Sequence, residues 1–75
     1  MTNMDRNAAY LRSLRHKALA ESVEFFEGDV EAAERWLSTP VRGLGYQTPN
    51  DMLSSETGIE QVRTLIGRLE HGIVT

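Results

Sequence analysis

The chain has 75 residues, no cysteine and a net charge of −3, and these values exclude several classes of protein. A chain of this length forms one small domain with a thin core, because it buries only about 60–65% of its unfolded surface. Without cysteine it forms no disulfide and no thiolate metal site. It contains no apolar run of the roughly 18–20 residues that span a bilayer, and its start lacks the apolar segment of a secretory signal. We therefore expect a cytoplasmic protein with no membrane segment.

The charge is unevenly distributed along the chain. Residues 1–20 carry a net charge of +3, residues 21–40 carry −5, and the remainder carries −1. A nucleic-acid-binding module presents a dominant basic face, which the chain as a whole lacks. Only the basic start could contact phosphate, and its cationic residues are Arg6, Arg12, Arg15 and Lys17.

The first half of the sequence predicts two helices. The first covers residues 5–27, where apolar residues recur at helical spacing, namely Leu11, Leu14, Ala18 and Phe25. Gly28 is placed to end this helix in a left-handed C′ conformation, which glycine adopts without a Cβ penalty. Asp29 supplies an N-cap oxygen for a second, shorter helix that runs to about Leu37. Pro40 stops that helix, since proline disfavours the helical conformation in the residue before it.

The middle of the sequence predicts a loop and a short helix. Residues 40–47 read as a loop, in which the two glycines of 43–45 (Gly-Leu-Gly) take strained backbone angles while the leucine enters the core. Residues 48–51 (Thr-Pro-Asn-Asp) form a helix start with threonine as the cap and proline at the first helical position. This third helix is expected to end near Ser55.

The last third of the sequence predicts a long amphipathic helix. Residues 57–60 (Thr-Gly-Ile-Glu) form a second capping box. The apolar residues that follow alternate by three and four: Ile59, Val62, Ile66, Leu69 and Ile73. Gly67 interrupts the helix at a cost of about 1 kcal/mol relative to alanine, so we expect close packing there, and Gly72 ends the helix. No segment has strand periodicity. The predicted fold is all-α, a small bundle of about four helices joined by a Gly/Pro loop.

No residue set indicates catalysis, a metal or a cofactor. His16 and His71 lie on different predicted helices without a neighbouring ligand pair. The carboxylates between Glu21 and Glu34 have helical spacing, but acid–base chemistry needs a cleft that perturbs their pKa values, and a solvated acidic face explains them. The glycines of 43–45 lack the lysine and hydroxyl of a phosphate loop. We therefore expect a protein that is not an enzyme.

Four features allow either a structural or a binding role. Trp36 fits a core anchor on the second helix better than an interface hot spot, whereas Tyr46 on its loop fits both equally. The cationic residues of the first helix do not share one face, so a solvated side explains them better than DNA contact. The closing segment, residues 67–75, mixes arginine, carboxylate and imidazole with apolar residues. It fits a frayed helix end and a partner-binding end equally well.

Most of the chain also carries a family resemblance. Its elements are, in order, Phe25-Phe26, Gly28-Asp29, Ala33, Trp36-Leu37, Leu44-Gly45, Thr48-Pro49, Leu53, Gly58, Val62 and the closing 67–72 (Gly-Arg-Leu-Glu-His-Gly). Their order and spacing over residues 18–75 resemble the C-terminal toxin-binding domain of the Xre/MbcA/ParS-like antitoxins. Residues 1–17 would then be an N-terminal helical extension. Those residues are too few for the promoter-binding helix-turn-helix of larger members, and Tyr46 stands where many relatives have a small residue.

The resemblance implies a function and a set of partner-binding residues. In that family the domain binds and occludes a RES-type toxin that acts on NAD, and the end of the antitoxin lies near the toxin's active-site entrance. The implied contacts are Arg68, Glu70, His71 and Gly72, with Arg63 and Tyr46 as companions. The antitoxin itself would use no cofactor and perform no catalysis.

Two further expectations concern partners. The alternative function is a small DNA-associated transcriptional regulator or adaptor that uses the basic first helix, although direct DNA binding is weakly supported. A thin core also favours a homodimer, or a hetero-oligomer with the toxin, because an apolar helix stripe buried between chains would offset the small core.

Overall fold

The computed structural model describes residues 3–72, with side chains from residue 7 onward. The described residues form four α-helices and one 3-10 turn: α1 (Asn3–Phe25), α2 (Val30–Leu37), η1 (Arg42–Leu44), α3 (Pro49–Met52) and α4 (Glu56–Glu70). The predicted all-α fold is confirmed. None of these helices is both long and apolar enough to cross a membrane. Ile73, the last position of the predicted apolar alternation, lies outside the described residues.

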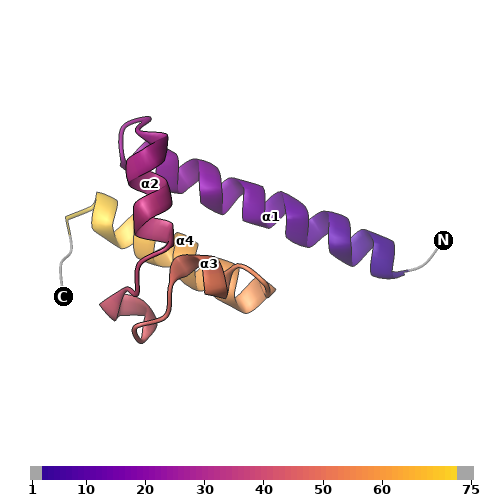
Figure 1. Cartoon of the computed structure of the whole chain (residues 1–75). Coiled ribbons are helices and arrows are strands. Elements are labelled where there is room, and N and C mark those ends of the chain that lie inside the picture. Colours follow the sequence, from indigo (N-terminus) through magenta and orange to yellow (C-terminus); the bar gives the residue numbers. More distant parts are fainter. Residues whose placement is uncertain (1–2, 73–75) are drawn as a thin grey trace.

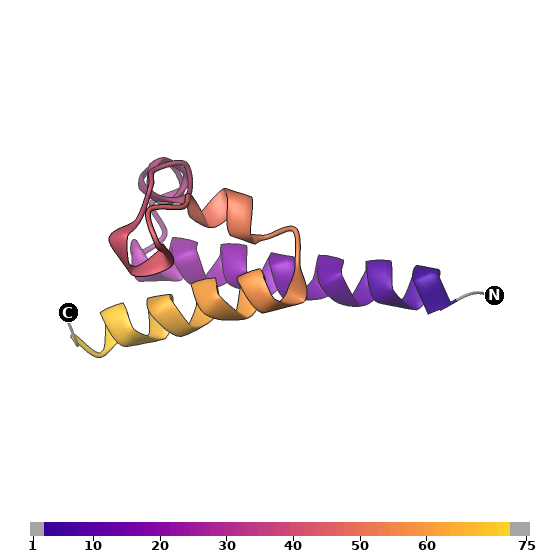
Figure 2. The same cartoon turned by 90° about the horizontal axis from the view of Figure 1, so that it is seen from below.

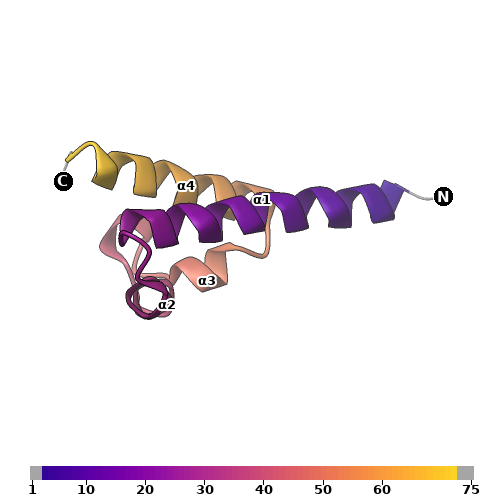
Figure 3. The ribbon, with the colours of Figure 1, turned by 90° about the horizontal axis from the view of Figure 1, so that it is seen from above.

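Helices α1 and α4 lie side by side and run in the same direction (Figures 2 and 3). The segment between them crosses one side of this pair, with α2, η1 and α3 forming a second layer (Figure 1). The first turns of α1 extend beyond the start of α4, so the molecule is elongated, measuring 43 × 26 × 21 Å. The predicted boundary between residues 17 and 18 falls inside α1.

The core lies where all the helices meet. Ile59, Val62 and Ile66 of α4 are almost completely buried, as their three-four spacing predicts. The other buried apolar side chains come from α1 and from the segment between α1 and α4: Leu14, Ala18, Ala33, Leu37, Leu44 and Leu53. Trp36 is half-buried and packs against this cluster. It therefore serves as a core anchor, as expected.

The first helix ends differently from the prediction. The N–H of Gly28 donates to the carbonyl of Val23 at 2.9 Å, and the N–H of Glu27 donates to Glu24 at 2.9 Å. This pair of bonds is a Schellman motif with Glu27 at C′, where its φ is +58°. Gly28 is one position further along at φ +87°. Gly28 had been predicted at C′, but α1 ends at Phe25, so the left-handed turn starts on glutamate.

The caps of α2 and α3 are confirmed. The side chain of Asp29 accepts a hydrogen bond from the N–H of Ala32 at 3.0 Å, and the hydroxyl of Thr48 accepts from the N–H of Asp51 at 3.1 Å. Helix α3 is nevertheless shorter than predicted. It ends at Met52 rather than near Ser55.

The start of α4 corrects two predictions. Ser55 is the N-cap, accepting from the N–H of Gly58 at 3.0 Å, so the predicted cap Thr57 lies inside the helix. The earlier start places buried Gly58 against the end of α3, where a Cβ would collide with the carbonyl of Met52. Close packing was predicted at Gly67, but a Cβ there would have no neighbour within 4 Å. The close contact is at Gly58 instead.

Candidate functional site

The C-terminal end of α4 is a regular, exposed helix terminus. Arg68 lies in the last turn, where a cation interacts favourably with the helix dipole. The N–H of the C-cap His71 donates to the carbonyl of Gly67 at 3.1 Å, and the N–H of Gly72 donates to Leu69 at 3.1 Å. Gly72 has φ +73°, the left-handed conformation in which helices end. Arg68, Glu70, His71 and Gly72, which were predicted from the sequence, are therefore together at one exposed end.

A groove of about 590 Å³ lies between this helix and the loop of the second layer. One wall is the polar stripe of α4 formed by Thr57, Glu60, Gln61, Thr64 and Arg68, and the other is the backbone of residues 43–45. Its floor contains Leu65, which a Cβ on Gly43 would approach to 3.0 Å. Sequence reasoning missed Glu60, Gln61 and Thr64. Their three-four spacing on the polar side of α4 was the signal that could have found them.

Two of the predicted residues, one of them Glu70 at the helix end, lie on the side of α4 that faces α1 and not on the groove side. Glu70 and Arg63 line a shallow hollow of about 160 Å³ beside α1, together with Glu21, Glu24 and Gly67. Successive residues of a helix are rotated by about 100°, so Arg68 and Arg63 project in different directions. The predicted set therefore divides between the groove face, the α1 face and the helix end.

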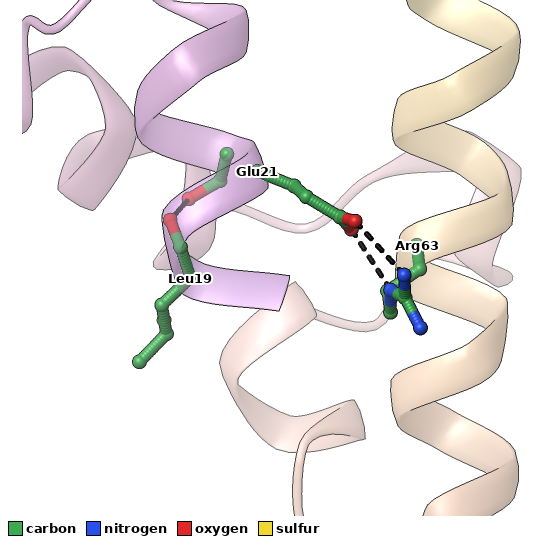
Figure 4. A network of polar contacts seen from close by, with 4 residues as sticks. Leu19, Glu21 and Arg63 are labelled. Atoms are coloured by element: carbon green, nitrogen blue, oxygen red, sulfur yellow. Dashed lines mark hydrogen bonds and ion pairs between the residues drawn. The ribbon is translucent and has the colours of Figure 1, made fainter. Parts of the chain in front are cut away.

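Arg63 is already paired within the chain. Its Nε and its second terminal nitrogen each donate to a carboxylate oxygen of Glu21 at 2.9 Å, a two-pronged ion pair that joins α4 to α1 (Figure 4). The hydrogen bond and charge of Glu21 raise the pKa of Arg63 above its ordinary value. Arg63 thus remains charged at all ordinary pH values, and its donors on this side are occupied. The buried Ser22 hydroxyl donates to the carbonyl of Leu19 at 2.7 Å.

Breaking this ion pair is expected to have a small effect on stability. The two side chains are about one-third exposed, so solvent screens their attraction, and Arg63→Met should cost about 0.5–1 kcal/mol. The loss should shrink in 1 M salt, where charges are screened within about 3 Å. Urea unfolding in low salt and in 1 M salt measures this loss of unfolding free energy. Arg68→Met on the same helix is the control, and an equal loss in that variant would contradict a role for the pair.

Tyr46 lies on a turn that is closed by backbone hydrogen bonds. The N–H of Val41 donates to Gln47 at 3.0 Å and that of Tyr46 donates back to Val41 at 2.9 Å, closing the loop at its base. Gly45 and Tyr46 have φ +65° and +66°, so the glycine at 45, but not that at 43, takes the expected left-handed conformation. Tyrosine rarely adopts this conformation, and its side chain is 69% exposed. Tyr46 is therefore a strained, exposed aromatic beside the groove.

The remaining ionisable residues form no second centre. Within the described part of the chain, no group of three or more metal-ligating side chains comes together. The hydroxyl of Tyr10 donates to Glu56 at 3.3 Å, and the charge of Glu56 raises the pKa of Tyr10. Arg15 donates from Nε to the carbonyl of Leu53 at 3.0 Å, so it ties α1 to the end of α3.

Comparison with known families identifies this architecture. A sequence profile described as the antitoxin Xre/MbcA/ParS C-terminal toxin-binding domain matches residues 22–72. The chain belongs to this family. The matched segment begins in the last turn of α1 and ends at Gly72, so it includes the groove, the Tyr46 turn and the exposed end of α4.

Two curated relatives extend the likeness within the family. The antitoxin Xre of Photorhabdus laumondii subsp. laumondii is 46% identical over 70 residues, which is 93% of this chain and 44% of that protein. The antitoxin Xre of Yersinia enterocolitica is 46% identical over 57 residues, 76% of this chain and 38% of that protein. The chain thus spans less than half the length of each of these two relatives.

Proposed function

We propose that this chain binds a RES-type toxin that acts on NAD and neutralises it by occluding the NAD cleft. The observation that supports the proposal is the match of residues 22–72 to a toxin-binding domain. The exposed end of α4 supplies the occluding groups, Arg68, Glu70 and His71, with Gly72 ending the helix beside them. The chain acts by binding, and any chemistry belongs to the toxin.

The end of α4 has chemistry that suits an NAD cleft. NAD carries a diphosphate, so its binding cleft must present cations or hydrogen-bond donors to negative oxygens. The carboxylate of Glu70 can meet such groups in place of the diphosphate, because charged acceptors form strong hydrogen bonds. Arg68 presents a planar fork of donors to carboxylate partners in the toxin. A narrow helix end with both charges can therefore enter the cleft and fill it.

Deletion of residues 68–75 tests the proposal. A tagged pull-down from the native host supplies the partner, and its consumption of NAD is measured as this chain is added. The full chain is expected to stop NAD consumption at equimolar amounts, and the deletion variant should lose at least 100-fold in inhibitory potency. Circular dichroism should still show a helical protein, since Ile59, Val62 and Ile66 remain in place. Full inhibition by the deletion variant would contradict the mechanism.

Replacing Tyr46 with glycine should raise the stability of the free chain and lower its affinity for the toxin. Glycine adopts positive φ without strain, so Tyr46→Gly is expected to stabilise the free chain by about 1 kcal/mol. The same change removes an exposed aromatic of the kind that anchors interfaces, and should weaken toxin binding about tenfold or more. Thermal unfolding and titration calorimetry measure the two effects. Unchanged affinity would assign Tyr46 a role outside the interface.

DNA binding gains no comparable support. Arg12 and Lys17 are exposed on α1, but Arg15 is engaged with the carbonyl of Leu53, and the side chain of Arg6 lies outside the described part. The two exposed cations are five residues apart, which separates them by about 140° around the helix. They do not form a recognition face. We therefore propose toxin binding as the function, and not transcriptional regulation.

A further inference from the structure

The groove between α4 and residues 43–45 contains two exposed charges of opposite sign. Glu60 lies in the second turn of α4 and Arg68 in the last turn. The one ion pair in the described part of the chain is that of Arg63 with Glu21, so the two groove charges have no charged partner there. At 1.5 Å per residue they are separated by about 12 Å along the helix. The groove therefore offers an acidic part and a basic part to a partner.

The space in the groove depends on the absence of a side chain at Gly43. Figure 2 shows η1, which contains this glycine, beside the C-terminal half of α4. A Cβ on Gly43 would lie 3.0 Å from the side chain of Leu65, on the floor of the groove. Gly43 does not have the left-handed φ of Gly45, so its backbone conformation does not require glycine. Glycine at position 43 instead leaves room above Leu65.

An extended peptide segment fits this lining better than a helix does. A helix binds a groove through several apolar anchors, but the described lining presents one accessible apolar side chain, Leu65. An extended segment has backbone N–H and C=O groups that need partners. The hydroxyls of Thr57 and Thr64 and the amide of Gln61 can both donate and accept. From Thr57 to Arg68 the groove is about 17 Å long, the length of roughly five extended residues.

The spacing of the two charges determines the side-chain pattern of such a segment. Side chains on one face of an extended chain recur every two residues, and four residues span about 13 Å. This length matches the separation of Glu60 and Arg68. A cation at position i of the segment would therefore meet Glu60, and a carboxylate at position i+4 would meet Arg68. The side chain at i+2 would lie between them and face Leu65, where burial favours an apolar group.

We propose that this groove binds an extended segment of the toxin that carries a cation, an apolar side chain and a carboxylate at positions i, i+2 and i+4. The inference rests on the proposed function, because it takes the toxin as the occupant. Arg68 borders both the groove and the exposed end of α4, so the two surfaces are continuous. All residues that line the groove also lie within the matched toxin-binding segment, residues 22–72.

The groove and the end of α4 then have different roles. The end of α4 occludes the NAD cleft, whereas the groove determines which toxin is recognised. A segment with its charges in the opposite order would place a carboxylate at Glu60 and a cation at Arg68. Such like-charge contacts reject a wrong partner.

Gln61→Trp tests whether the groove is occupied in the complex. Gln61 is exposed in the groove lining, so the indole would fill the groove without entering the core. Titration calorimetry with the toxin from the pull-down should show about 30-fold weaker binding, a loss typical of a central interface contact. Ser13→Trp, on the exposed surface of α1, is the control and should bind like the parent chain. Circular dichroism checks that both variants remain folded.

The outcomes separate this inference from the proposed function. If Gln61→Trp bound the toxin as tightly as the parent chain, the groove proposal would be overturned, while inhibition by the parent chain would still support the proposed function. A parent chain that left NAD consumption unchanged would overturn both.

A charge exchange tests the pattern and its direction. Glu60→Lys places a cation opposite the cation of the segment and should weaken binding about tenfold or more. Hydrogen exchange locates the segment, as the toxin peptide that the parent chain protects and Gln61→Trp does not. Changing the cation at position i of that peptide to glutamate should restore the affinity of Glu60→Lys and weaken that of the parent chain. A protected peptide without the pattern, or no recovery in the paired variants, would overturn the proposal.

Discussion

Replacing Gly58 with alanine is expected to destabilise the fold by about 2–3 kcal/mol, the cost of forcing an atom into a closely packed site. The added Cβ would collide with the backbone carbonyl of Met52, and this backbone has little freedom to move. The next residue, Leu53, is buried, and its carbonyl accepts a hydrogen bond from Arg15. A domain of this size has a total stability of roughly 4–11 kcal/mol, so the loss is a large fraction of it.

Gly67→Ala on the same helix is the matched control. A Cβ at Gly67 meets no atom within 4 Å, so alanine there should stabilise the helix by about 1 kcal/mol through its higher helix propensity. Urea unfolding of the two variants should therefore shift the midpoint in opposite directions. If Gly58→Ala remained within 0.5 kcal/mol of the parent chain, α3 could move away from α4 without penalty. The close approach at Gly58 would then not be a constraint on the fold.

The sequence predicted the helices well because most of their signals are local. Asp29 and Thr48 cap the helices that follow them through bonds to residues three positions away, and such bonds depend on the nearby sequence alone. The three-four alternation of Ile59, Val62 and Ile66 predicted the buried side of α4 for the same reason.

The errors arose where a contact between distant residues decided between two local options. Both Ser55 and Thr57 can cap a helix, and the packing of Gly58 against Met52 favours the earlier start. The end of α1 is a different case, in which Glu27 takes the left-handed position although Gly28 follows it. Local propensity favours glycine at that position, and no packing contact among the described residues explains the choice of glutamate at this exposed turn.

The candidate site was predicted as a list of residues, but its geometry was not. The family resemblance grouped Arg63 with Arg68 as a companion partner-binding residue. Arg63 is instead bonded to Glu21, which is 42 positions away in the chain. The three-four spacing of apolar residues showed which side of α4 is buried. It did not show which of the two neighbouring sides of α4 faces α1. That assignment needed the packing of α1 against α4.

Arg68→Glu is the point variant with the largest expected effect on toxin binding. Arg68 is exposed and borders both the groove and the helix end, so reversing its charge should leave the unfolding midpoint of the free chain almost unchanged. In the proposed complex the new carboxylate would face the acidic groups that the arginine met. The dissociation constant should therefore rise about 100-fold, which corresponds to about 2.7 kcal/mol, mostly through faster dissociation.

Arg35→Glu provides the control for total charge. It makes the same change on the exposed surface of α2, so both variants alter long-range attraction to the toxin equally. Surface plasmon resonance separates the two effects, because long-range attraction changes the association rate and a lost contact changes the dissociation rate. Only Arg68→Glu should dissociate faster. Equal losses in both variants, confined to association, would mean that the toxin responds to net charge and that the end of α4 makes no specific contact.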